Sequence, residues 1–243
     1  MVTLRSGTHS RRRFPGALLA IAALTMAIEA PSAAAADKGR TVVELFTSQG
    51  CSSCPPADDY LAKLSQRPDV IALSFGVTYW DRLGWRDTNA RKDFTARQVA
   101  YEAPLGEAGP FTPQIVVGGR ASATGSETQA VERLIAAERA ITQATTLAVS
   151  PDSVAIGSGR APPGGADIWL VRYDPKRIEV PVRRGENAGR TLAHANVVRD
   201  LKLLGQWSGA ATTIAFQPAA EGLRTAVIVQ GRNHGPIAAA ATD

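Results

Sequence analysis

The chain contains two cysteines, Cys51 and Cys54, separated by two serines. An apolar β-prone run precedes the pair and a helical pattern follows it, so both thiols fall where a strand turns into a helix. The free N–H groups and partial positive charge of a helix start stabilise a thiolate. The pattern therefore predicts a dithiol that closes and opens as a disulfide, with Cys51 and Cys54 as candidate catalytic residues.

The two cysteines have different expected roles in such a reaction. Cys51 lies at the helix start and is expected to be the more exposed thiol, so it is the candidate nucleophile that forms a mixed disulfide with a substrate. Cys54 lies a turn further in and is the candidate resolving thiol. The serines between them carry no charge, so we expect the helix start to be the main cause of a lowered Cys51 pKa.

One acidic residue, Glu44, interrupts the apolar strand before the pair. A buried carboxylate is costly unless it has a partner. Two interpretations stay open: Glu44 accepts a proton from Cys54, or it is a strand-edge residue bonded to a neighbour.

Three aromatic residues, Tyr79, Trp80 and Trp85, gather in a loop after the second strand. Long loops with aromatic side chains often line a substrate cleft, but such rings also cap a core or pack between domains. Asp81 and Asp87 are expected to fix this loop. The histidines His194 and His234 share no spacing and are expected to be surface or turn residues.

The elements around these residues alternate between strand and helix up to residue 141 and are β-rich afterwards. We expect an α/β domain over residues 37–143 and a β-rich, sandwich-like domain over residues 144–243. Residues 197–204 fit either a strand or a helix, and we favour a strand. The expected strands are 41–46, 70–75, 114–117, 121–124, 147–149, 154–156, 168–173, 178–182, 197–204, 212–216, 225–230 and 236–240, and the expected helices are 57–66, 90–101 and 127–140.

The first 36 residues have the basic start, short apolar run and small-residue end of a cleaved export signal. Arg11 and Arg12 also fit a twin-arginine signal, and a Sec signal stays equally open. The segment holds four of the 27 basic and one of the 22 acidic residues, which leaves 23 and 21, a net charge of +2. We expect a periplasmic or secreted protein without stable membrane insertion, and no nucleic-acid partner.

Several segments together resemble the DUF1223 family of exported thioredoxin-like proteins. They are residues 41–58 (TVVELFTSQGCSSCPPAD), 79–87 (YWDRLGWRD), 111–117 (FTPQIVV), 184–187 (RGEN) and 196–201 (NVVRDL). The resemblance implies a thioredoxin-like domain, over residues 37–143, followed by a β-rich domain, over residues 144–243, and implies little about substrate. Where many family members carry His and Asp, this chain has Gly76 and Thr78.

In the thioredoxin fold a cis-proline before the third strand packs against the disulfide, and the residue before it binds an extended substrate. The resemblance assigns these places to Pro113 and Thr112, although a trans proline that starts a strand stays open. Tyr79, Trp80 and Trp85 are the other candidate substrate-binding residues.

Three functions compete on these observations. The first is an exported thiol–disulfide oxidoreductase that acts on a protein thiol, disulfide or redox partner without a cofactor. The second is a non-catalytic envelope binding module in which Cys51–Cys54 is a structural disulfide. The third is a thiolate copper carrier, which has only two sulfur ligands because no methionine follows residue 36; no metal site is expected from the other residues.

Overall fold

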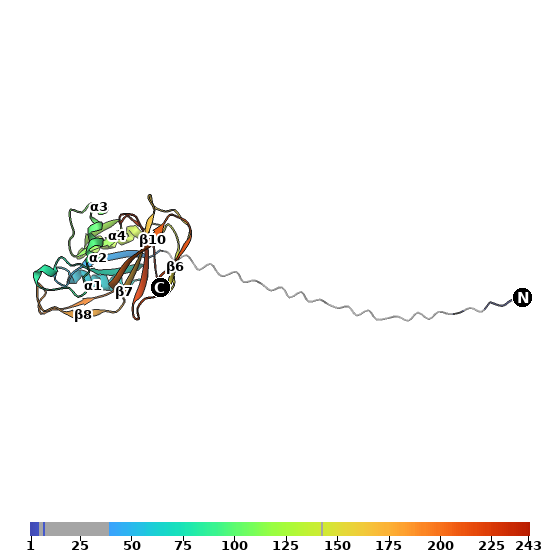
Figure 1. Cartoon of the computed structure of the whole chain (residues 1–243), viewed down its shortest axis with the longest axis horizontal. Helices are drawn as coiled ribbons and strands as arrows, with labels where there is room; N and C mark the ends of the chain where they lie inside the picture. Colours follow the sequence, from blue (N-terminus) through green and yellow to red (C-terminus); the bar gives the residue numbers. More distant parts are fainter. Residues whose placement is uncertain (5–6, 8–38, 142) are drawn as a thin grey trace. The chain divides into compact units, whose positions relative to one another are not determined.

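The computed structural model describes residues 1–4, 7, 39–141 and 143–243. Apart from residues 1–4 and 7, the expected export signal lies outside the described residues. The described residues from 39 onward belong to one compact unit (Figure 1). In the described part of the chain, none of the helices is both long and apolar enough to cross a bilayer.

The first half of this unit is a mixed α/β arrangement. Strands β1 and β2 pair in parallel, β3 adds antiparallel to β1, and β4 adds antiparallel to β3. The hairpin predicted at residues 114–117 and 121–124 has the bounds expected. Its turn contains Gly118 and Gly119, both with positive φ, which glycine adopts without steric cost. The elements are β1 (Thr41–Thr47), α1 (Pro55–Leu64), β2 (Val70–Gly76), the 3-10 helix η1 (Asp81–Leu83), α2 (Lys92–Ala100), α3 (Glu102–Leu105), β3 (Gln114–Val117), β4 (Ala121–Thr124) and α4 (Thr128–Arg139).

The second half consists of strands among the described residues. Residues 197–204 lie in a strand, which confirms that choice over a helix. The short strand β9 was not predicted from the sequence. The elements are β5 (Leu147–Val149), β6 (Ser153–Ile156), β7 (Ala166–Asp174), β8 (Ile178–Pro181), β9 (Thr191–His194), β10 (Val197–Trp207), β11 (Thr212–Ala215), β12 (Arg224–Gly231) and β13 (Ile237–Thr242).

One eight-stranded sheet runs through both halves, in the order β13-β12-β7-β10-β2-β1-β3-β4. The join is narrow: β10 pairs with β2 only at Val197 and Ser74, and the Asn196 side chain donates to the Ala72 carbonyl at 2.8 Å. The sheet therefore continues across the boundary expected between residues 143 and 144. A three-stranded sheet, β11-β6-β5, packs on the second half, and β8 and β9 form a separate hairpin.

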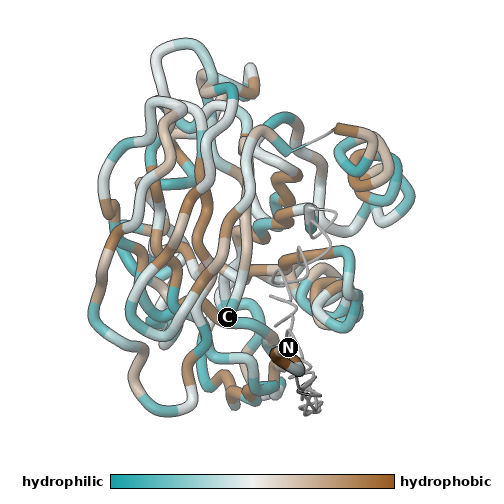
Figure 2. The backbone as a smooth tube through the Cα atoms, turned by 90° about the vertical axis from the view of Figure 1, so that its right-hand side faces the viewer, coloured by the Kyte–Doolittle hydropathy of each residue, from teal (hydrophilic) through white to brown (hydrophobic). Residues whose placement is uncertain are grey.

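Side-chain alternation along β1 assigns its residues to two cores. Val43 and Leu45 pack with α1 and α4 on one face, whereas Val42 and Phe46 pack with α2 on the other. Figure 2 shows hydrophobic residues concentrated along the central strands, with hydrophilic residues in many of the loops.

The parallel pairing of β1 and β2 places the loops that carry the candidate site residues at the same edge of the sheet. Parallel strands place their carboxyl ends at the same edge of a sheet. The loop after β1, which carries both cysteines, therefore lies beside the loop after β2, which carries the aromatic residues. Thr47 pairs with Gly76 at this edge.

Candidate functional site

Cys51 and Cys54 form a disulfide in the loop between β1 and α1, with Cα atoms 5.4 Å apart. Cys54 is the N-cap of α1, and Pro55 follows as the first helical residue, where its missing N–H leaves no bond unmade. The Ser53 hydroxyl lies 3.2 Å from the Cys51 Sγ, where it can donate to a thiolate.

Both cysteines are 0% exposed. The expectation that Cys51 is the more exposed thiol is therefore wrong for this structure. A segment outside the strand–helix unit lies against the cysteine loop: the loop of the β8–β9 hairpin is hydrogen-bonded to its backbone.

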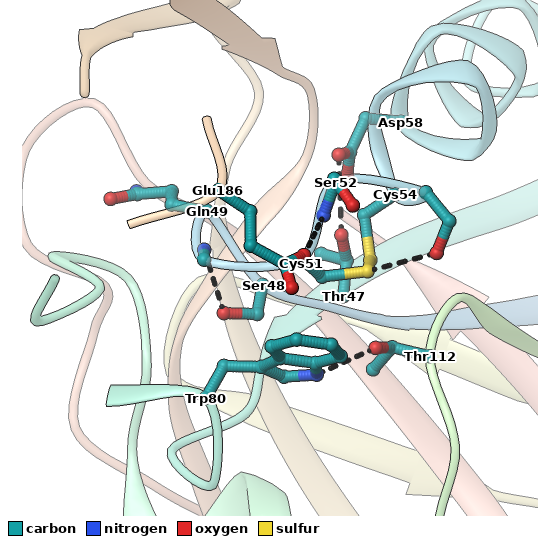
Figure 3. The surroundings of a disulfide bond; sticks show 12 residues. Thr47, Ser48, Gln49, Cys51, Ser52, Cys54, Asp58, Trp80, Thr112 and Glu186 are labelled. Atoms are coloured by element: carbon teal, nitrogen blue, oxygen red, sulfur yellow. Dashed lines mark hydrogen bonds between the residues drawn. A yellow bond between two sulfur atoms is a disulfide. The ribbon is translucent and has the colours of Figure 1, made fainter. Parts of the chain in front are cut away.

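Two neighbouring residues of that loop make the contacts. The buried Asn187 side chain donates to the carbonyls of Gln49 at 3.0 Å and Cys51 at 2.8 Å. The Glu186 Oε2 accepts a hydrogen bond of 3.1 Å from the Ser52 N–H, as Figure 3 shows. Arg190 in turn donates to the Asn187 Oδ1 at 2.7 Å.

Trp80 and Thr112 lie together next to the pair. The Trp80 indole N–H donates to the Thr112 Oγ1 at 2.8 Å (Figure 3). A Cβ added to Gly50, the residue before Cys51, would lie 3.2 Å from the Trp80 Cβ, so this tryptophan packs on the cysteine loop. The Thr112–Pro113 peptide bond is cis. A Cβ added at Gly125 would lie 2.8 Å from the Ala57 Cβ and 3.2 Å from the Pro113 Cβ, which places Pro113 near the first turn of α1.

The other two aromatic residues lie differently. The Trp85 indole N–H donates to the Gln49 Oε1 at 2.9 Å, and Gly185 of the hairpin loop lies close to the Trp85 Cβ. Tyr79 packs on the core formed by α2 and the sheet, with its ring centroid 6.5 Å from that of Trp80. Burial raises the pKa of Tyr79.

The two aspartates fix the aromatic loop as expected. Asp87 accepts from the backbone N–H groups of Gln49 and Asn89, both at 2.7 Å, and Asp81 accepts from the Asp87 N–H at 3.1 Å. Asp87 thus ties the aromatic loop to the cysteine loop.

Glu44 does not serve the cysteines, because it lies on the α2 face of β1 whereas α1 covers the other face. Its carboxylate pairs with the Arg97 guanidinium at 2.6 Å and accepts from the Tyr101 hydroxyl. Arg97 also donates to Gln230 on β12 at 3.1 Å. The interpretation of Glu44 as a proton acceptor for Cys54 is therefore wrong, and since β1 is an inner strand, Glu44 is not at a strand edge either.

A different carboxylate, Asp58, lies on the cysteine side of β1. It is one helical turn after Cys54 in α1 and is 3% exposed. Its Oδ2 accepts from the Thr47 hydroxyl at 3.2 Å, and its Oδ1 lies 3.4 Å from the Nδ1 of His194 on β9. Asp58 is among the residues that surround the disulfide in Figure 3. The spacing of four residues from Cys54 is the sequence signal that points to it.

Asp58 and His194 lie close enough to affect each other's pKa. Burial raises the pKa of Asp58, although the close contact with His194 and its charge oppose this. Burial alone lowers the pKa of His194, but the close contact with Asp58 and the charges of Asp58 and Asp87 raise it overall. Within the described part of the chain, Asp58 Oδ1 and His194 Nε2 are buried without a hydrogen-bond partner. The expectation that His194 is a surface or turn residue is wrong: it is 3% exposed, in a strand.

His234 does lie in a turn, with φ of 57° at Asn233 and 55° at His234 itself. Its ring packs against those of Tyr101 and Trp169, with centroids 5.4 and 5.7 Å away. Burial lowers the pKa of His234 to about 4.

Gly76 leaves no room for the side chain that many relatives are expected to carry there. An added Cβ would lie 2.7 Å from the carbonyl carbon of Asn89. Thr78 bonds instead to Thr95, its N–H donating to the Thr95 hydroxyl at 2.9 Å. Among the residues described, no group of three or more His, Cys, Asp or Glu side chains is placed to hold a metal ion.

The profile of a family of proteins of unknown function, DUF1223, matches residues 42–230. The chain belongs to the DUF1223 family. This confirms the family assignment made from residues 41–58 and the later segments.

Two solved structures are similar to this chain. The crystal structure of protein AGR_C_4864 from Agrobacterium tumefaciens is 33% identical, with a TM-score of 0.70, over 86% of this chain and 95% of that one. HBP35 of Porphyromonas gingivalis is 12% identical, with a TM-score of 0.54, over 84% of this chain and 74% of that one, so it shares the fold alone. No curated protein matches.

Proposed function

We propose that this DUF1223 protein is an exported thiol–disulfide oxidoreductase that uses Cys51 and Cys54. The observation that carries the proposal is the buried Asp58–His194 pair one helical turn from a disulfide at the start of α1. A structural disulfide needs no titratable partner, whereas thiol exchange needs a group that takes and returns protons.

Further features support a thioredoxin-like arrangement of the first half. The strand order β2-β1-β3-β4, the parallel β1–α1–β2 unit and the cis bond before β3 agree with the resemblance to that fold. Thr112, Pro113 and Trp80 would then line the place of an extended substrate, with Tyr79 behind Trp80 and Trp85 at the hairpin loop. The basic start, short apolar run and small-residue end of residues 1–36 support a periplasmic or secreted location.

The residues permit a balanced exchange. The Cys51 thiolate attacks one sulfur of a substrate disulfide, which forms a mixed disulfide and releases one substrate thiolate. Cys54 gives its proton to the Asp58–His194 pair. Its thiolate then attacks the Cys51 sulfur and releases the second substrate thiol. The protein disulfide forms and two electrons pass to the substrate; the reverse sequence oxidises a substrate dithiol.

A second function is favoured by one observation, the complete burial of both sulfurs. A buried disulfide whose loop is bonded to the β8–β9 loop fits a structural crosslink in an envelope binding module. Under the first proposal the loop must move aside for exchange, since a buried sulfur offers no path to a substrate.

A redox titration separates the two functions. The purified protein lacking residues 1–36 is equilibrated with glutathione and with dithiothreitol, and free thiols are counted by alkylation and mass. The oxidoreductase proposal predicts a reversible two-electron transition while circular dichroism shows the native fold. Reduction that occurs only together with unfolding would reject it and favour the structural disulfide.

A further inference from the structure

The β8–β9 loop brings a negative charge to the cysteine pair. The Glu186 carboxylate accepts the N–H of Ser52, the residue that directly follows Cys51 (Figure 3). Its neighbour Asn187 is buried and bonded to the carbonyls of Gln49 and Cys51, so the loop backbone beside Glu186 is held at the cysteine loop. Hydrogen bonds from Ser52 lower the pKa of Glu186, which is therefore ionised at neutral pH.

This charge acts on only one redox state. The disulfide is neutral, whereas the reduced pair carries a thiolate at Cys51 to the extent that its pKa allows. The groups that favour this thiolate are the N–H donors of the helix start and the Ser53 hydroxyl. Glu186 occupies one N–H of this loop and adds a like charge, so it disfavours the reduced state relative to the disulfide.

We propose that Glu186 sets the direction of thiol exchange: it lowers the reduction potential of the Cys51–Cys54 pair, so that the reduced protein donates electrons to disulfide-bearing substrates. The inference rests on the proposed function of the pair. In this direction the protein dithiol and a substrate disulfide yield the protein disulfide and two substrate thiols, and the two electrons come from Cys51 and Cys54.

Other charged groups near the pair come from different elements and are unchanged by a substitution at Glu186. Asp58 lies on α1, His194 on β9, Asp87 in the loop before α2, and Arg190 in the same hairpin loop, bonded to Asn187. A comparison of variants at residue 186 alone therefore isolates its charge.

The test is an equilibrium with reduced and oxidised glutathione at pH 7, measured for the wild type, Glu186→Gln and Glu186→Lys. Gln keeps an acceptor for the Ser52 N–H without the charge, and Lys reverses the charge. We expect the equilibrium constant for oxidation of the protein by glutathione disulfide to fall at least about threefold in Glu186→Gln and further in Glu186→Lys. The Cys51 thiolate, followed by its ultraviolet absorbance, should titrate at lower pH in the same order.

Glu179→Gln is the matched control, because Glu179 is an exposed glutamate on β8 of the same hairpin. Its equilibrium constant should equal that of the wild type. An unchanged or higher constant in both Glu186 variants would overturn the inference while the proposed function stands. A wild-type pair that is reduced only on unfolding would overturn both.

Discussion

Two buried acid–base pairs lie on opposite faces of β1. Glu44 and Arg97 face α2, and Asp58 and His194 lie on the side of α1. Each pair is almost completely removed from solvent: the side chains are 1% exposed in the first and 2% in the second. The sequence shows both acids within fifteen residues of each other, but their surroundings differ.

The difference lies in the hydrogen bonds between the two members of each pair. Glu44 binds Arg97 through two hydrogen bonds and accepts a third from Tyr101, while Arg97 reaches Gln230 on β12. This network connects the two halves of the sheet. Asp58 Oδ1 and His194 Nδ1 are instead 3.4 Å apart. In the described part of the chain, Asp58 Oδ1, His194 Nε2 and Arg97 Nη1 are each buried without a hydrogen-bond partner. Several short hydrogen bonds make the first pair a stabilising contact of the fold, whereas the longer contact of the second pair, beside a disulfide, leaves it free to exchange protons.

The largest expected effect comes from a substitution that breaks the Glu44–Arg97 pair. Arg97→Leu leaves the Glu44 carboxylate buried without its charge partner, and we expect the free energy of unfolding to fall by about 3–5 kcal/mol. Urea unfolding measures it. Glu44→Gln leaves the Arg97 guanidinium buried without its counter-charge, and we expect a loss of similar size. If Arg97→Leu unfolds like the wild type, the pair does not hold the halves together.

The next effect concerns the second pair. Asp58→Asn removes the proton-accepting carboxylate, and we expect the rate of reduction of the disulfide by dithiothreitol at pH 7 to fall about 100-fold, the lower end for general acid–base catalysis. The exposed neighbour provides the control: Asp59→Asn should react at the wild-type rate. Equal rates in Asp58→Asn and Asp59→Asn would contradict a role in proton transfer.

The pH dependence of stability distinguishes the pairs further. The raised pKa of His194 means that the folded state holds this proton more tightly than the unfolded chain, in which the pKa is near 6.5. The stabilisation is present in full below 6.5 and is lost as the pH rises through the raised folded-state pKa.

We therefore expect the difference in unfolding free energy between the wild type and His194→Gln, about 1–2 kcal/mol at pH 6, to shrink toward pH 9. Guanidinium unfolding at both pH values measures it. A difference that grows with pH would show the wrong sign and reject the protonated pair.

The smallest expected effect comes from a substitution in the β8–β9 loop, which lies against the cysteine loop. Asn187→Ala removes two hydrogen bonds to the cysteine loop, and we expect a loss of about 1–2 kcal/mol in unfolding free energy. Because the β8–β9 loop then opens more readily, reduction by dithiothreitol should be a few-fold faster than in the wild type. The same variant would react more slowly, or at the same rate, if the loop does not limit access.

The strand–helix half was predictable because its signals are local. The prolines after Cys54 and the glycines between β3 and β4 mark boundaries through their own backbone preferences. Strand β9 was missed because Thr191–His194 is short and has only two apolar side chains, and its pairing with β8 is set by the hairpin. Because β9 was not predicted, His194 was not expected in a buried strand. No local pattern connects it with Asp58.

The identity of the acid beside the disulfide was less predictable. Glu44 attracts attention as the only charge in an apolar strand, yet alternation turns it toward Arg97, a residue 53 positions away. Asp58 carries the simpler signal, its spacing of one helical turn from Cys54. Glu186 and Asn187 contact the cysteine loop across more than 130 residues of sequence. No residue spacing in the sequence predicts these contacts.

The most direct test of a working Cys51–Cys54 dithiol is to trap the mixed disulfide in the folded protein. Cys54→Ser and Cys51→Ser, each with one remaining thiol, are incubated with glutathione disulfide at pH 7 and analysed by mass. We expect Cys54→Ser to gain one glutathione rapidly on Cys51, whereas Cys51→Ser reacts far more slowly. Adducts that form in neither variant until the protein unfolds would contradict a working dithiol at this site.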